Sequence, residues 1–131
     1  MALTKHDFKC TCGLPGCRAP LISGLLIRKI NRVLRRTGID TLQVRSGARC
    51  EAFNRSVGGS PGSAHKRGLA ADLNTTALEI EQLRRLWDEI DREQFSLLGV
   101  GPGFIHVDIR GANSTIRRYF KTLLKFMKWG K

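Results

Sequence analysis

The chain contains 131 residues with a mass of 14.6 kDa, the size of one domain. Its 41% hydrophobic and 26% charged residues are ordinary for a globular protein with its own core. The 23 Lys and Arg against 11 Asp and Glu give a net charge of +12, which predicts a polyanionic neighbour: nucleic acid, anionic lipid or an acidic cell-wall polymer. No stretch approaches the ~20 apolar residues of a membrane span, and the start of the chain lacks a signal peptide's apolar core. We therefore expect the chain to begin its life in a cytoplasm.

Three of the four cysteines gather near the N-terminus. Cys10, Cys12 and Cys17 follow His6, while Cys50 stands apart. These three with His6 would supply four ligands for a structural zinc ion, but the spacing lacks the C-x-x-C pair of a zinc finger. A disulfide between Cys50 and the cluster is an alternative that a reducing cytosol disfavours. Unpaired thiols are the interpretation that the sequence favours most.

The first half of the chain predicts one helix and one strand. Residues 1–17 are expected to be irregular because glycine and proline interrupt them. Apolar residues at helical spacing predict a helix over 19–36 that stops at Gly38. Residues 41–46 then predict a short strand. Residues 47–68 are rich in Gly, Ser and Pro and are interpreted as a long loop, of the kind that usually carries function.

The second half predicts alternating strands and one further helix. Residues 68–73 are expected to form a buried strand, and the capping box at residues 76–79 is expected to open a helix that reaches Ile90. Residues 95–100 predict another strand, and a Gly-Pro-Gly turn leads into a strand over 104–110.

The strand over 104–110 alternates with period two. One face would pack on the core, and it carries Ile105, Val107 and Ile109. The other face carries Phe104, His106, Asp108 and Arg110. A face with histidine and aspartate two residues apart can line a functional site, although an exposed strand face is the simpler interpretation.

The end of the chain is basic. After Asp108 it has seven Lys and Arg residues and no acidic residue. Aromatic and aliphatic residues interleave with this charge, so residues 112–131 predict a basic amphipathic helix or tail, not a separate domain. It would either pack on the domain with a solvated basic face or bind an anionic membrane surface.

Two of the three histidines have a carboxylate partner within reach. His65 lies in the Gly/Ser-rich loop, Asp72 follows on a strand, and a neighbouring strand can bring His106 beside both. Two imidazoles and one carboxylate suit catalytic zinc, which keeps a coordination position open. Such an ion activates water and polarises carbonyl groups, so this set of ligands indicates hydrolysis.

The residues around these ligands follow a recognisable order. The first motif is Ser46-Gly47-Ala48-Arg49-Cys50, and it is followed by Asn54 and by Val57-Gly58-Gly59. Two further motifs are S-A-H-K-R-G-L-A-A-D at residues 63–72 and F-I-H-V-D at residues 104–108. This order resembles the M15 peptidases, the zinc D-Ala-D-Ala carboxypeptidases and peptidoglycan endopeptidases related in fold to the hedgehog signalling domain. The likeness is strongest to small phage and prophage forms and covers residues 7 to 111.

The resemblance implies a zinc site formed by His65, Asp72 and His106. It also implies that Arg49 faces the metal, binds a substrate carbonyl or carboxylate and stabilises the oxyanion, a role that suits a fixed cationic fork. Ser63 would shape the loop or contact substrate.

The fold expected from the resemblance and the pattern of elements is α+β. It would hold a small, mostly antiparallel sheet with helices on one side, as in the hedgehog and DD-peptidase folds. Residues 1–111 would form the peptidase domain.

One position departs from the family pattern. Many members place an acidic general base three residues before the last histidine, where this chain has Gly103. Asp108, on the same strand face as His106, would then be either the base or a partner that orients His106.

We expect a monomeric zinc peptidase that cleaves the peptide stems of peptidoglycan, as a phage or prophage endolysin held in the host cytoplasm until release to the wall. The basic tail would bind anionic membrane or outer-membrane lipid. The alternative is a non-catalytic zinc module that recognises wall peptide. Nucleic-acid binding rests on charge alone, because no recognition motif accompanies it.

Overall fold

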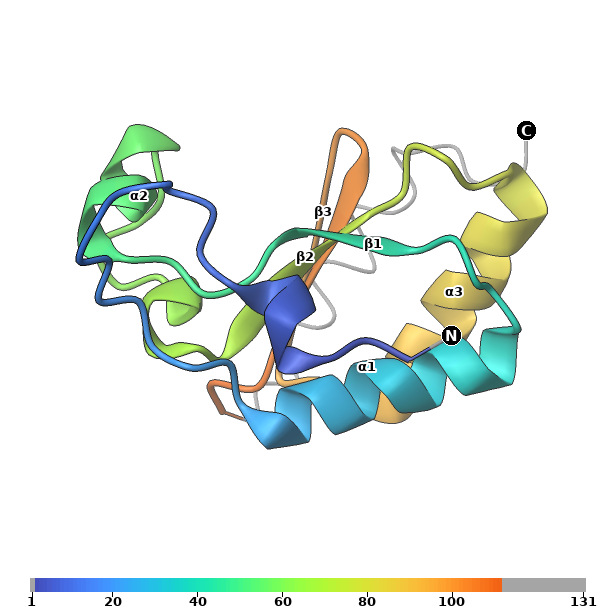
Figure 1. Ribbon diagram of the computed structural model, residues 1–131. Helices are drawn as coiled ribbons and strands as arrows, with labels where there is room; N and C mark the ends of the chain where they lie inside the picture. Colours follow the sequence, from blue (N-terminus) through green and yellow to red (C-terminus); the bar gives the residue numbers. More distant parts are fainter. Residues whose placement is uncertain (1, 112–131) are drawn as a thin grey trace.

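The computed structural model describes residues 2–111 of the chain (Figure 1). Three helices, four strands and two short 3₁₀ turns alternate along them. In order they are η1 (Lys5–Phe8), α1 (Gly24–Thr37), β1 (Gln43–Ser46), α2 (Glu51–Ser56), η2 (Ala64–Arg67), β2 (Ala70–Asn74), α3 (Ile80–Glu93), β3 (Leu97–Gly101) and β4 (Phe104–Asp108). The predicted α+β class is confirmed.

The four strands form one antiparallel sheet in the order β1-β2-β4-β3. In the register of β2 and β4, Asp72 lies opposite His106 and Leu73 lies opposite Ile105. Because side chains alternate across a strand, the sheet has one apolar and one polar face. A bulge in β1, between Val44 and Ser46, places Ser46 opposite Asp72 on the polar face.

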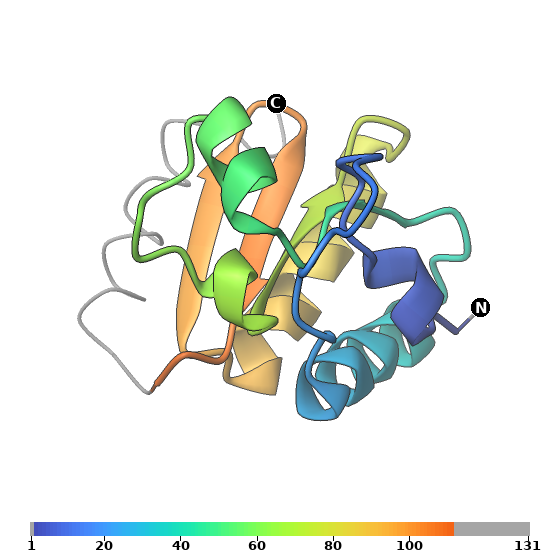
Figure 2. The same cartoon turned by 60° about the vertical axis from the view of Figure 1, so that its left-hand side comes forward.

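Helices α1 and α3 cover the apolar face of the sheet (Figure 1). Leu26, Ile30 and Leu34 of α1 and Leu86 and Ile90 of α3 are fully buried. They join a single core with sheet residues, which are Ala71, Leu73, Leu98, Ile105 and Val107. In Figure 2, α2 and η2 lie in front of the strands, apart from this helical pair. The expected packing of helices on one side of the sheet holds for α1 and α3.

A buried carboxylate ties α1 to the end of α3. Glu93, 7% exposed, accepts hydrogen bonds from Arg32 at 2.7 Å and Arg36 at 3.0 Å, and Lys29 lies 3.6 Å away. Burial opposes ionisation of Glu93, but these cations, chiefly Arg32, hold its pKa below the ordinary value.

Element boundaries differ from those predicted wherever a cap decides them. Helix α3 starts at Ile80, with Glu79 and Gln82 forming the capping box, because Thr76 instead bonds to the Asn74 side chain. Helix α1 starts at Gly24 behind the cap Ser23. The predicted loop over 47–68 contains α2 and η2.

The predicted C-terminal helix over 112–131 lies outside the described residues. Within the described part of the chain, every helix is too short or too polar to cross a bilayer.

Candidate metal centre

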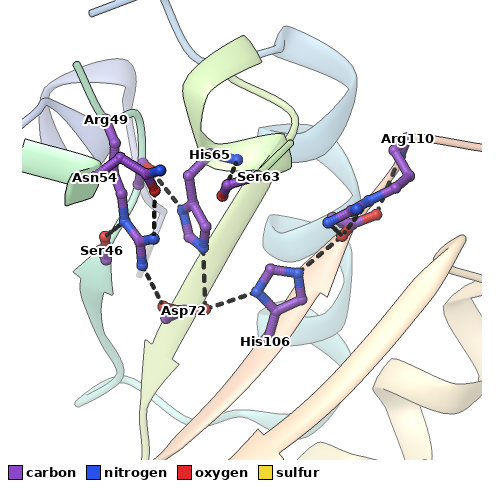
Figure 3. Close-up of polar contacts among 10 residues, drawn as sticks. Ser46, Arg49, Asn54, Ser63, His65, Asp72, His106 and Arg110 are labelled. Carbon is purple, nitrogen blue, oxygen red and sulfur yellow. Dashed lines mark hydrogen bonds and ion pairs between the residues drawn. The ribbon is translucent and has the colours of Figure 1, made fainter. Parts of the chain in front are cut away.

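The centre forms where the polar face of the sheet meets η2. Asp72 of β2 and His106 of β4 are cross-strand neighbours, so the sheet itself holds their side chains together. His65 comes from η2, whose cap Ser63 accepts a hydrogen bond from the His65 amide at 3.2 Å. Figure 3 shows the three side chains pointing toward one another.

The three side chains converge through specific atoms. Asp72 Oδ1 lies 3.3 Å from His65 Nε2 and 2.8 Å from His106 Nδ1. One ligand atom from each residue lies within 4.8 Å of the others. The structure therefore brings together the three metal ligands that the sequence predicts.

Main-chain geometry orients His65. Its Nδ1 lies 2.7 Å from the carbonyl oxygen of Gly47. A carbonyl oxygen only accepts hydrogen bonds, so Nδ1 carries the proton and Nε2 presents a lone pair. That lone pair faces another acceptor, Asp72 Oδ1. Two acceptors at this distance repel each other unless a cation or a proton lies between them, so the geometry fits a metal ion.

A buried carboxylate orients His106. Asp108 is fully buried, and its Oδ2 lies 2.8 Å from His106 Nε2. Arg110 donates to the same oxygen from Nε at 3.0 Å and approaches it with Nη2 at 2.8 Å. A carboxylate that accepts the distal N–H of a ligand histidine fixes the ring and raises its basicity.

The charges of these groups depend on one another. Burial opposes ionisation of Asp72, but the adjacent imidazoles of His106 and His65 hold its pKa well below its usual range. Burial would lower the pKa of His106, but hydrogen bonds to Asp108 and Asp72 raise it above the ordinary value. Burial likewise opposes ionisation of Asp108, but hydrogen bonds with His106 and Arg110 lower its pKa. Asp72 and Asp108 are therefore both ionised near neutral pH, with the His106 imidazole between them.

Arg49 is held as a rigid fork beside the ligands (Figure 3). Its Nε donates to Ser46 Oγ at 3.0 Å, its Nη1 to Asn54 Oδ1 at 3.1 Å and its Nη2 to Asp72 Oδ2 at 3.2 Å. Asn54 is itself buried and donates to the Ser60 carbonyl. Asp72 thus divides its two oxygens between Arg49 and the histidines.

A cavity of about 360 Å³ opens over the centre. Its lining includes the three ligands with Arg49, Ser63, Phe104 and Arg110. The predicted substrate-contact residues Arg49 and Ser63 therefore share one cavity with the ligands. A second cavity, of about 340 Å³, lies on the Ser46 side of Arg49 and reaches Phe53 and Val57.

Gly103 occupies the position where the resemblance led us to look for an acid, and it has no side chain to supply one. It lies in the β3–β4 turn with φ of 76°, and a Cβ there would meet Thr76 Cγ2 at 2.8 Å. Among the described residues that line the first cavity, Asp72 is the only carboxylate. Asp108 lies behind His106, so its geometry favours the orienting role over direct contact with water.

The sequence suggested His6, Cys10, Cys12 and Cys17 as ligands of a structural zinc ion, and the structure has Cys50 in place of His6. The sulfur atoms of Cys10, Cys12 and Cys17 lie within 4.8 Å of one another and of Cys50, and His6 is not in this group. Spacing could not identify Cys50, because the fold returns to the N-terminal segment only after α1 and β1. The contact of His65 with the Gly47 carbonyl also had no signal in the sequence, whereas Arg110 and Asp108 were expected on one strand face without a bond being predicted.

Comparison with known proteins agrees with the geometry. The family model of peptidase M15 matches residues 1–108, which contain every ligand of the centre and Arg49. Among curated individual proteins, none matches the chain. Since the family match covers more than half of the chain, the protein belongs to the M15 peptidase family.

Proposed function

We propose that the protein is a zinc-dependent peptidase that hydrolyses the peptide stems of bacterial peptidoglycan, as a phage or prophage endolysin. The observation that carries the zinc assignment is the convergence of His65 Nε2, Asp72 Oδ1 and His106 Nδ1 beneath an open cavity. Nitrogen and carboxylate ligands in a set of three are typical of catalytic zinc. When bound there, zinc would polarise a peptide carbonyl and make water reactive near neutral pH.

Arg49 binds the substrate in this proposal. Its guanidinium is fixed by three hydrogen bonds before substrate arrives, so little side-chain freedom is lost on binding. A fixed positive charge beside the ligands is placed to hold the substrate carbonyl oxygen and to stabilise the negative charge that develops on it. Ser63 shapes the same wall of the cavity.

The cavities suit an extended, acidic peptide. Arg49 lines both, and Arg45 and Arg110 extend the positive charge to either side. Peptidoglycan stems carry free carboxylates, which arginine binds through paired hydrogen bonds. This arrangement supports a wall peptide over a neutral substrate.

Asp108 acts in the proposal as the residue that orients His106. Its oxygens are occupied by His106 and Arg110, and it is fully buried. No acidic side chain follows Asp108 in the sequence. If a carboxylate moves the proton, Asp108 is the nearest candidate after the ligand Asp72.

The basic tail and the cellular setting are part of the proposal. A monomer would remain in the host cytoplasm until the inner membrane opens, and residues 112–131 would then bind anionic outer-membrane lipid. Removing residues 112–131 should reduce lysis of permeabilised cells more than hydrolysis of purified wall. Equal losses on both substrates would assign the tail a structural role instead.

Purified peptidoglycan tests the enzyme directly. Release of new amino groups should stop with a chelator and return with zinc, and mass spectrometry of the muropeptides would identify the bond. Activity that a chelator leaves unchanged would contradict the zinc assignment. Activity on casein but none on peptidoglycan would contradict the substrate.

Gly103 favours a second candidate, a non-catalytic zinc module that recognises wall peptide. The position of the usual acid has no side chain, and the strain of its φ disfavours any other residue there. Zinc binding and wall binding without release of amino groups would support the module and exclude the enzyme.

A further inference from the structure

Four cysteines converge at a point away from the His65 centre. Cys10, Cys12 and Cys17 belong to the irregular segment between η1 and α1, and Cys50 is the cap residue of α2. Their four sulfur atoms all lie within 4.8 Å of one another. Cys17 is exposed and the other three are partly buried, so the cluster lies near the surface.

The upper limit of 4.8 Å on the separations of the four sulfur atoms accommodates one ion with four ligands. Tetrahedral zinc with Zn–S bonds of about 2.3 Å separates its sulfur ligands by about 3.8 Å. Two disulfides would need only two close pairs, and nothing would hold one pair against the other. All four residues are unpaired thiols that share one centre. The arrangement is therefore that of a Cys₄ metal site.

Backbone amides point at the sulfur atoms. The Leu14 amide donates to Cys12 Sγ at 3.3 Å, and the Cys50 amide donates to Cys10 Sγ at 3.4 Å. The Phe53 amide donates to Cys50 Sγ at 3.4 Å. Hydrogen bonds of this kind orient ligands and stabilise thiolate charge around a bound metal.

The N-terminal segment has little else to order it. Residues 9–21 contain no helix or strand and no buried side chain. Ordering a residue costs about 1–2 kcal/mol of conformational entropy, which burial of apolar side chains cannot offset in this segment. A bound metal supplies that free energy, because its ligands come together only in the folded chain.

We propose that Cys10, Cys12, Cys17 and Cys50 bind a structural zinc ion. The ion would tie the N-terminal segment to the start of α2. Cys50 directly follows Arg49, so the same ion would anchor the chain beside the substrate-binding fork. This inference does not depend on the proposed function, because it concerns different residues and its readout is not activity.

Cobalt(II) in the full-length protein tests the site. Cobalt bound by thiolates gives intense charge-transfer absorption in the near ultraviolet, which a site of two histidines and one aspartate does not give. We expect this band in the wild-type protein and in His65→Ala, and its loss in the Cys10→Ser/Cys17→Ser double variant. Bound zinc should fall by about one ion per chain in the Cys10→Ser/Cys17→Ser variant relative to the wild type, whatever the His65 centre binds.

The wild-type protein decides the question even if the double variant fails to fold. Without a thiolate band, and with all four thiols reacting freely under native conditions, the proposal is wrong. It is equally wrong if freshly purified protein contains disulfides, seen as a lower mass before reduction. Loss of the band in His65→Ala would also overturn it, since the thiolate signal would then not belong to the cysteines alone.

Discussion

The His65 centre and the cysteine cluster are both groups of metal-binding side chains, but the chain holds them differently. In the His65 centre, two ligands are cross-strand neighbours, and hydrogen bonds orient both rings. In the cysteine cluster, three ligands lie on a segment without regular structure. A metal in the His65 centre would add reactivity to side chains that the protein already holds in place. A metal in the cysteine cluster would itself hold the N-terminal segment in its folded position. Losing the metal should therefore damage activity at one site and local order at the other.

The largest expected effect is the loss of activity without loss of fold. His65→Ala removes a ligand from η2 and leaves the sheet ladder unchanged, so peptidoglycan hydrolysis should fall about a thousandfold or more. Circular dichroism should match the wild type, and His6→Ala, at an exposed position of η1, is the matched control. Unfolding of His65→Ala at ordinary temperature would show that this site, too, depends on its metal for structure.

Substituting the fixed fork should be nearly as damaging. Arg49→Lys keeps the charge but cannot reach Ser46, Asn54 and Asp72 together, so kcat/KM should fall about a hundredfold. Arg55→Lys is the control, because Arg55 is exposed on α2 and lines neither cavity. Equal kinetics for Arg49→Lys and the wild type would mean that charge alone suffices at this position.

Asp108 separates orientation from proton transfer. Asp108→Ala should weaken zinc affinity about 10- to 100-fold, and excess zinc should restore most of the activity, because the residue acts through His106. Asp108→Asn keeps an acceptor for His106 and should lose less. Full zinc occupancy with activity still absent, and an altered acid limb of the pH profile, would instead identify Asp108 as the base.

Chelation should loosen only one of the two regions. Without metal, amide exchange over residues 9–21 should accelerate about tenfold or more, while β2 and β4 keep their protection through the sheet hydrogen bonds. Hydrogen exchange followed by mass spectrometry measures this difference. If chelation accelerates amide exchange equally in residues 9–21 and in strands β2 and β4, the two sites do not differ in their dependence on metal for local order.

The smallest effect lies away from both clusters. Glu93→Gln should cost about 2 kcal/mol of unfolding free energy at pH 7, because Glu93 joins α1 to α3 through charged hydrogen bonds. The folded pKa of Glu93 is lowered, so its contribution is complete above its ordinary value of 4.5 and disappears as pH falls through the folded value. Urea denaturation at a series of pH values measures this loss. A difference that grows on acidification would contradict the assignment.

The sequence predicted those parts of the structure that repeat or that carry a motif. The helix of Gly24–Thr37 and strand β4 follow from apolar periodicity, the other three strands follow from short apolar runs between turn residues, and the three ligands follow from the family pattern. Helix α2 was missed because its six residues are too short to show a period and lie among glycines and serines.

Long-range contacts were beyond the sequence. Nothing in the spacing places Cys50 beside Cys10, since that contact depends on how α1 and β1 reverse the chain. The bond between Asp108 and His106 was foreseen as one of two alternatives, but the burial that distinguishes them comes from packing. The caps Glu79 and Ser23 were missed because local side-chain competition decides them.

The hydrogen bond between His65 and the Gly47 carbonyl affects how the protein tolerates mutation. His106 is oriented by a side chain, so a single codon change at Asp108 removes its partner. No side-chain substitution removes the acceptor of His65, because the acceptor is a main-chain atom. Its weak point is Gly47 itself, where a Cβ would meet the Phe8 carbonyl oxygen at 2.4 Å and displace the backbone. Gly47 therefore fixes the position of the proton on His65 although it has no side chain. A search for functional residues by side-chain chemistry alone would miss it.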